Sequence, residues 1–245
     1  MNLKSKLLLA LLATSSAAFA QTAPAAPEST LGYNVGVVSE YRYRGIGQTK
    51  GDPALQGGVD YTDASGFYLG TWGSTIKWIK DTGGSKGSTE LDIYGGYKFE
   101  AAGLGFDVGY LRYEYTKNDY APNANTNEVY GAATYGPATL KYSNSLTNLF
   151  GNTDSKGSTY WDLSATFDLD GGYTLVPHIG RQAIKNHADL SYTDVALTLN
   201  KDLGNGLVAS VSAISTNGGV AIKNLSTTGY DAAKNSVVVG VKYSF

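Results

Sequence analysis

Val237-Val238-Val239-Gly240-Val241-Lys242-Tyr243-Ser244-Phe245 alternates apolar residues with small or polar ones and stops at an aromatic side chain. Successive side chains of a β-strand point to opposite faces. The odd-numbered residues of this stretch therefore form one apolar face, and the even-numbered residues, apart from Val238, form a small or polar face. This pattern is typical of a strand that faces lipid on one side and a barrel lumen on the other.

The N-terminal residues predict export. Lys4 and Lys6 precede an apolar run, and Ala18-Phe19-Ala20 fits the A-x-A pattern of a secretory signal peptide. We expect a signal peptide over residues 1–20, cleaved after Ala20, a periplasmic segment over 21–31 and a barrel over 32–245. At the opposite end, the aromatic side chains of Tyr243 and Phe245 resemble the assembly signal that the Gram-negative barrel-assembly machinery reads.

The composition narrows the class of protein. The 245 residues carry 19 Lys+Arg against 21 Asp+Glu, which argues against a nucleic-acid partner. With 0 Cys, an exported chain must be stabilised without disulfides. The 31 Gly and 19 Tyr suit a wall of strands with two membrane interfaces. Residues 83–88 and 168–172 lack the spacing of a phosphate loop or a calcium loop, so no cofactor or metal is predicted.

Period-two alternation predicts about twelve strands. The connections between them alternate between short turns and longer polar loops, with both termini on the short side. A soluble β-sandwich also alternates, but its strands average about five or six residues, whereas several here reach the roughly ten that cross a bilayer at a tilt. We therefore expect an all-β, antiparallel, up-and-down transmembrane barrel in the bacterial outer membrane, with short periplasmic turns and longer extracellular loops. The predicted strands are 32–44, 54–62, 66–76, 89–99, 103–115, 127–135, 138–146, 159–169, 172–182, 190–200, 206–215 and 236–245.

Three successive motifs are the most specific part of the chain: YRYRGIGQT at 41–49, PALQGGVDY at 53–61 and GFYLGTW at 66–72. This run resembles the signature of the TorF-like porin family, also called the Gcw_chp family of proteobacterial outer-membrane proteins. Gly47 stands where that family usually has Ser. The resemblance implies an outer-membrane barrel with pore activity.

Strand parity predicts which signature residues face the lumen. The first predicted strand runs to Arg44. Its parity places Tyr41 and Tyr43 toward lipid, and it places Glu40, Arg42 and Arg44 toward the lumen. A turn at 63–65 would pair Asp60 with Tyr68 and Gln56 with Trp72. These inward groups either brace the wall through ion pairs and stacking or form a solute-contacting constriction, and both readings stay open. The predicted pore-lining residues are Glu40, Arg42, Arg44, Gln56, Asp60, Tyr68, Trp72, Glu90, Asp92 and Lys98.

The remaining inward candidates, which are Asp107, Lys141, Asp162, His178 and Asp194, give the set an acidic excess and so predict a weak preference for cations. About twelve strands predict a narrow lumen, because eight-stranded barrels are filled by side chains and those of about sixteen leave a channel. The favoured function is passive diffusion of small solutes or ions.

Two other functions stay open. The barrel could be a non-conducting adhesin or structural surface protein that binds through its loops. An outer-membrane hydrolase is the least favoured, because His187 has no serine in a nucleophile context nearby. The expected partners are outer-membrane lipid, the barrel-assembly machinery and small solutes or ions, while the sequence does not predict the oligomeric state.

Overall fold

The structure is a computed structural model, and it describes residues 29–83, 86–219, 222 and 228–245. The predicted signal peptide, its cleavage site after Ala20 and most of the predicted 21–31 segment lie outside the described residues. Among the residues it does describe, no helix is long and apolar enough to cross a membrane.

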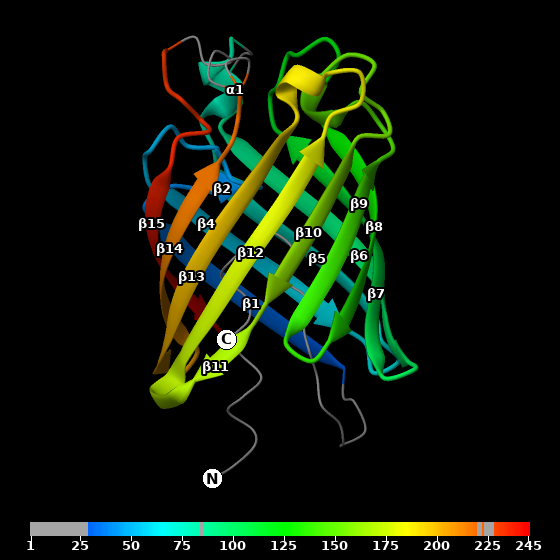
Figure 1. The fold of residues 1–245 in the computed structure, drawn as a ribbon, viewed down its shortest axis with the longest axis vertical. Helices are drawn as coiled ribbons and strands as arrows, with labels where there is room; N and C mark the ends of the chain where they lie inside the picture. The colour runs from blue at the N-terminus through cyan, green and yellow to red at the C-terminus, as the bar shows by residue number, and fades with distance from the viewer. Residues whose placement is uncertain (1–28, 84–85, 220–221, 223–227) are drawn as a thin grey trace.

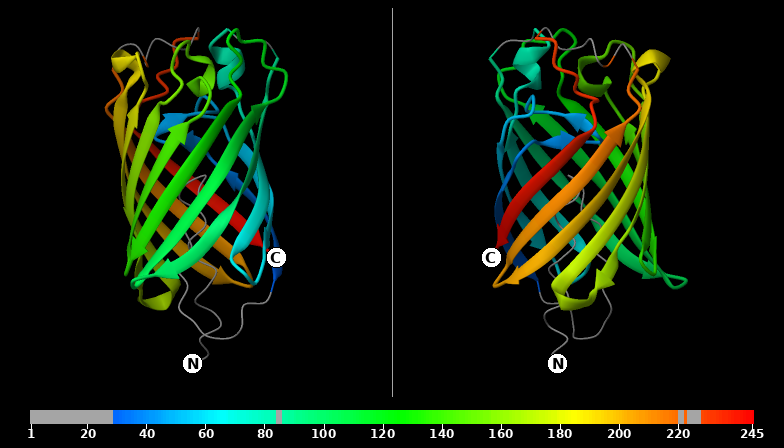
Figure 2. Two further views of the ribbon diagram at one scale, coloured as in Figure 1. Left: turned by 90° about the vertical axis from the view of Figure 1, so that its right-hand side faces the viewer. Right: turned by 60° about the vertical axis from the view of Figure 1, so that its left-hand side comes forward.

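The described residues form a closed antiparallel barrel of twelve wall strands, as predicted (Figures 1 and 2). Neighbours in sequence pair with one another, and β1 (Thr30–Val38) pairs with both β4 (Ala54–Thr62) and β15 (Ser236–Ser244), which closes the ring. β10 (Thr159–Ala165) and β11 (Phe167–Leu169) both pair with β12 and count as one wall strand. The others are β5 (Phe67–Thr75), β6 (Thr89–Ala101), β7 (Leu104–Tyr115), β8 (Thr126–Tyr135), β9 (Ala138–Ser145), β12 (Tyr173–Ala183), β13 (Tyr192–Gly204) and β14 (Leu207–Thr216).

The wall strands expose apolar side chains and bury polar ones. On β15, Val239 and Val241 are 53% and 47% exposed, whereas Lys242 is 8% exposed. On β6, Leu91 is exposed and Asp92 is buried. A soluble sandwich would bury the valines, so this inverted burial is the arrangement expected of a barrel surrounded by lipid.

The two ends of the barrel differ as predicted. The end that we call the turn end carries short connections, including the turn η3 (Asp170–Gly172), and both the start of β1 and Phe245 lie toward it (Figure 2). The opposite end, which we call the loop end, carries longer connections that contain the short helices α1 (Trp78–Asp81), η2 (Leu149–Gly151) and η4 (Ala188–Leu190).

The predicted first strand is wrong beyond Val38. Residues 39–53 leave the wall and form an inner hairpin, with β2 (Arg42–Tyr43) paired to β3 (Ile46–Gly47). Tyr41 and Tyr43, which parity placed toward lipid, are buried at 4% and 8% exposure. Their hydroxyl groups find polar partners inside the barrel that lipid could not supply. The chain reverses at Arg44 and Gly45, whose φ angles of 46° and 75° do not occur in an extended strand.

The predicted register of β4 on β5 is also wrong, by two residues. Asp60 pairs with Gly70 rather than Tyr68, and Gln56 pairs with Ser74 rather than Trp72. The turn includes Gly66, and it is therefore longer than the predicted 63–65 connection. Because a shift of two residues keeps every side chain on its face, the inward assignments on these two strands are unaffected.

Candidate pore interior

Glu40 and Arg42 connect the inner hairpin to the segment that leads into β15. The Arg42 Nε donates a hydrogen bond to a Glu40 carboxylate oxygen at 3.0 Å, and Nη1 donates to the Ala232 carbonyl at 2.9 Å. The Ser236 hydroxyl donates to Glu40 at 2.7 Å, and the Tyr230 hydroxyl donates to the other carboxylate oxygen. Both charged side chains are almost completely buried, so each charge is paired inside the barrel.

Arg44, at the reversal of the hairpin, binds the opposite side of the barrel. Its Nη1 and Nη2 donate to the two carboxylate oxygens of Glu128 on β8, at 3.0 and 2.7 Å. Nη1 also donates to the Gln182 side chain on β12 at 2.9 Å. The guanidinium lies 4.3 Å from the centre of the Tyr160 ring and 4.9 Å from that of Tyr43. A two-pronged ion pair of this kind is stronger and more directional than a single contact.

The base of the hairpin is attached to the loop end. The backbone amides of Lys77 and Trp78 both donate to the Gln48 carbonyl, at 2.8 and 3.0 Å. The Lys77 ammonium forms an ion pair with Asp52, and this hydrogen bond holds the pKa of Asp52 below its usual value. The hairpin is therefore held at its base as well as at its reversal.

An apolar cluster rich in aromatic residues fills the space between the hairpin and the loops. The Tyr43 ring makes edge contacts with Tyr113 and Phe150, with ring centres 5.5 and 5.8 Å apart. Ile79 of α1 is fully buried in the same cluster. Packed side chains therefore occupy the loop half of the lumen. The buried members are Tyr41, Tyr43, Ala54, Ile76, Ile79, Leu111, Tyr113, Tyr115 and Ala124.

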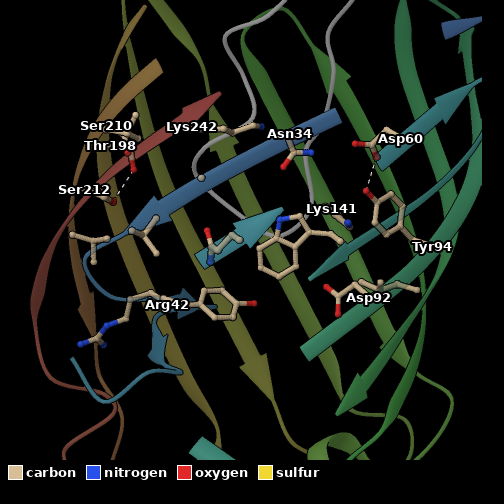
Figure 3. A pocket seen from close by; sticks show the side chains of 18 of the residues that line it. Asn34, Arg42, Asp60, Asp92, Tyr94, Lys141, Thr198, Ser210, Ser212 and Lys242 are labelled. Carbon is tan, nitrogen blue, oxygen red and sulfur yellow. Dashed lines mark hydrogen bonds between the residues drawn. The ribbon is translucent and has the colours of Figure 1, made fainter. Parts of the chain in front are cut away.

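A cavity of about 230 Å³, lined by charged, polar and apolar side chains, occupies the other half of the lumen (Figure 3). On one side, the Tyr94 hydroxyl donates to Asp60, and on the opposite side Thr198 and Ser212 share a hydrogen bond of 2.7 Å. The charged lining residues comprise four bases and four acids, so the lining does not have the acidic excess predicted for the whole inward set. They are Arg42, Lys98, Lys141 and Lys242, and Glu40, Asp60, Asp92 and Asp107.

Tyrosines organise the charges on one wall of this cavity. The Tyr68 hydroxyl donates to Asp107 at 2.6 Å and also contacts the Tyr130 hydroxyl. The Lys98 ammonium lies 4.8 Å from the centre of the Tyr68 ring, and the Lys141 ammonium lies 3.8 Å from that of Tyr130. These cation–π and hydrogen-bond contacts order the side chains, so this wall presents a fixed pattern of charge.

A smaller cavity of about 50 Å³ contains His178 between two carboxylates. The His178 Nε2 lies 2.8 Å from an Asp194 oxygen, and Nδ1 lies 3.2 Å from an Asp162 oxygen. The Tyr160 hydroxyl donates to Asp194 at 3.0 Å. Because Arg44 lies over the ring of the same tyrosine, Tyr160 connects the histidine group with Arg44. Three of the predicted inward residues thus meet in one buried network.

The predicted pore-lining residues occupy three different places. The larger cavity is lined by Glu40, Arg42, Gln56, Asp60, Tyr68, Trp72, Asp92 and Lys98. Arg44 lines the smaller cavity. Glu90 is 1% exposed and accepts a hydrogen bond from the Tyr41 hydroxyl at 2.7 Å, which places it behind the hairpin.

Several interior residues were not singled out from the sequence. Glu128, Tyr94 and Tyr130 lie on the inward faces of β8 and β6, and strand parity alone could have placed them there. No sequence signal connected Glu128 with Arg44, because their contact depends on how the barrel closes and on the departure of the hairpin from the wall.

The two histidines lie in different surroundings. The His187 Nε2 contacts the Thr153 carbonyl at 2.7 Å in an exposed loop. His178 is surrounded by carboxylates and a tyrosine. Within the described part of the chain, no cluster of His, Asp and Glu has the arrangement of a metal site.

The predicted assembly residues lie on the outer surface at the turn end. The Phe245 ring stacks on Tyr243 and on Tyr33, with ring centres 5.3 and 5.6 Å apart. Around the same end, Phe99 stacks on Tyr97 and on Phe106. These outward rings form the kind of aromatic band that lies at a membrane interface.

Comparison with known proteins gives a family and a fold. Residues 21–245 match the family described as "Bacterial protein of unknown function (Gcw_chp)". A search of curated proteins finds no match. Among solved structures, the KdgM porin in complex with disordered oligogalacturonate is similar, with 10% identity, a TM-score of 0.56 and coverage of 89% of this chain and 99% of that one. The NanC porin is similar too, with 12% identity, a TM-score of 0.54 and coverage of 87% and 99%.

Proposed function

Since the chain belongs to the Gcw_chp family of bacterial proteins of unknown function, we propose its function from its own geometry: it is an outer-membrane porin for passive diffusion of small solutes or ions through a narrow lumen. The observation that carries this proposal is the inverted burial of a closed barrel around a cavity with eight charged residues in its lining. An apolar outer surface suits lipid, and charged groups on opposite sides of a cavity suit the passage of water-soluble molecules.

The placement in the cell belongs to the same proposal. We infer that residues 1–20 are a signal peptide cleaved after Ala20, that 21–31 lead into the barrel on the periplasmic side, and that Tyr243 and Phe245 address the barrel-assembly machinery. The family match from residue 21 onward supports this division of the chain. The motifs over 41–72 support the finer assignment to TorF-like porins.

The lining supports weak ion selectivity, because bases and acids balance in the larger cavity. Arg42 is the charge to test, since it lines both cavities. Planar-bilayer recordings of the purified barrel should show discrete conductance steps with a cation-to-anion permeability ratio near one. Arg42→Ala should shift that ratio toward cations, because it removes a fixed positive charge from the passage. A barrel that shows heat-modifiable migration on a gel and never conducts, even when a short turn replaces the inner hairpin, would refute the proposed function.

A second function is favoured by the packed cluster in the loop half of the lumen. A barrel filled in this way could act as a non-conducting adhesin or structural surface protein. Tyr230 and Ala232, in the loop before β15, bond to the inner hairpin rather than projecting outward. The same recordings separate the two functions, because an adhesin needs no conductance and should instead lose surface binding when its outer loops are shortened.

A further inference from the structure

We propose that the inner hairpin is a displaceable plug, and that the ion pair between Arg44 and Glu128 is the latch that holds it in place. The inference rests on the proposed channel function, since a plug regulates only a barrel that conducts. It identifies the moving element and the contact that opposes its movement.

The hairpin and the side chain of Arg44 together reach across the lumen. Its chain ends continue from β1 and into β4, which are adjacent wall strands. Its reversal at Arg44 is bonded to β8 and β12, which lie on the far side of the ring in the order of the strands. At the same reversal, the Gly45 carbonyl accepts a hydrogen bond from Thr216 of β14 at 2.8 Å. A segment attached to opposite walls divides the lumen, which agrees with the packed cluster on its loop side and the larger cavity on the other.

The hairpin can move because it is not part of the wall. Its own sheet consists of two residue pairs, Arg42 with Gly47 and Tyr43 with Ile46, and neither β2 nor β3 pairs with a wall strand. Arg44 and Lys50 have φ angles of 46° and 61°, a conformation that ordinary side chains disfavour and that the surroundings must hold. Val38 and Ala54 already pair with each other at the hairpin base, so the pairing of β1 with β4 does not depend on the hairpin.

The Arg44–Glu128 pair holds the reversal of the hairpin against the far wall, and both of its groups are buried. Their side chains are 8% and 2% exposed, and each would be costly to bury alone. If Glu128 loses its charge, the guanidinium is left buried without a counter-charge, and a hairpin that swings out into water relieves this penalty. The hydrogen bonds of Tyr41 with Glu90 and of Tyr43 with Tyr113 resist the same movement.

Three variants test the latch in planar bilayers. Glu128→Gln removes the counter-charge and keeps the shape, and it should raise the open fraction of the channel about tenfold or more. Glu114→Gln is the matched control: its ion pair with Arg112 is partly exposed and lies away from the hairpin, so the open fraction should not change. In the third variant, an Asn-Gly turn joins Val38 to Ala54 in place of the hairpin, and this barrel should be open continuously.

The outcomes separate the plug from the channel. Heat-modifiable migration first establishes that each variant is a folded barrel. Raised conductance in Glu128→Gln and in the hairpin deletion, with Glu114→Gln like the wild type, supports the latch. Equal, measurable conductance in the wild type, Glu128→Gln and the deletion overturns the plug and leaves the porin standing. A deletion variant that is folded and does not conduct overturns the porin itself. A conducting deletion with an unchanged Glu128→Gln overturns the role of the ion pair.

Discussion

Placing a charge on the lipid face of β12 should destabilise the barrel by an amount set by depth. Ile179 is 47% exposed, and its neighbours Leu163 and Val195 on β10 and β13 are exposed as well. Leu169 is 45% exposed and pairs with Tyr173, where β12 begins at the turn end. Arginine at each of these two positions therefore tests the same face at two heights.

The expected costs follow from strand geometry. Leu169 lies at the height of Tyr173, with which it pairs. Tyr173 and Ile179 are six residues apart on β12, which is about 20 Å along a strand that rises about 3.4 Å per residue. At a tilt of about 40°, this separation corresponds to about 15 Å of depth, which is more than half of an apolar band about 25 Å tall. Arginine costs about 2–4 kcal/mol at the midplane of the bilayer and about 0–1 kcal/mol near its interface. Ile179→Arg should therefore cost about 2–3 kcal/mol more than Leu169→Arg.

The measurement is the free energy of unfolding in lipid vesicles, obtained from a guanidinium titration followed by tryptophan fluorescence. Both variants are compared with the wild type in vesicles of the same lipid, with reversibility checked by refolding. Equal costs at the two positions, or a larger cost for Leu169→Arg, would refute the depth assignment and with it the claim that this face of β12 lies in hydrocarbon.

Three other changes test the turn end and the hairpin. Hydrogen bonds from the Ser65 hydroxyl and amide lower the pKa of Asp63 to about 2. The ionised carboxylate should therefore stabilise the turn at pH values above the ordinary carboxyl pKa, and this stabilisation should be lost as the pH falls through about 2. An NMR titration midpoint near 4 would contradict this. Phe245→Ala loses two stacking contacts worth about 0.5–1.5 kcal/mol each and should slow formation of the heat-modifiable barrel more than Phe99→Ala, while equal rates would argue against a special role in assembly. Gly45→Ala would bring a methyl group against Asp194 and Thr216 and should raise conductance, whereas Gly136→Ala, which has no atom within 4 Å of the new methyl, should leave it unchanged; conductance that does not rise in Gly45→Ala would contradict the packing argument.

The strands of the wall could be predicted because the alternation of apolar and polar residues is visible within each strand. β4 has the predicted bounds, and β15 alternates as expected over its whole length. The register between β4 and β5 could not be read in the same way, since pairings two residues apart place the same side chains on the same faces. Turn length decides between such registers, and the turn extends to Gly66, one residue beyond the predicted 63–65 connection.

The site was harder to predict than the wall because it depends on where the chain leaves the wall. The alternation continues past Val38 to Arg44, so parity alone could not separate a long strand from a short strand followed by an inward segment. Arg42 and Arg44 do lie inside the barrel, but on a hairpin rather than on β1. The partner of Arg44 is 84 positions away in sequence, and pairing across a ring cannot be read from either strand alone.

The contact between β1 and β15 has a consequence for the order of folding. Tyr33 and Phe245 exchange backbone hydrogen bonds of 2.9 and 3.0 Å, and among the described pairs they join residues from the two extremes of the ring. Close to the same seam, the Ser39 amide bonds to the Val239 carbonyl at 2.8 Å, and Ser236 bonds to Glu40. Closing so long a loop costs the most chain entropy and is expected late. The residues that begin the hairpin therefore also take part in the contact between β1 and β15. We expect the hairpin to be inside the barrel by the time these two strands pair.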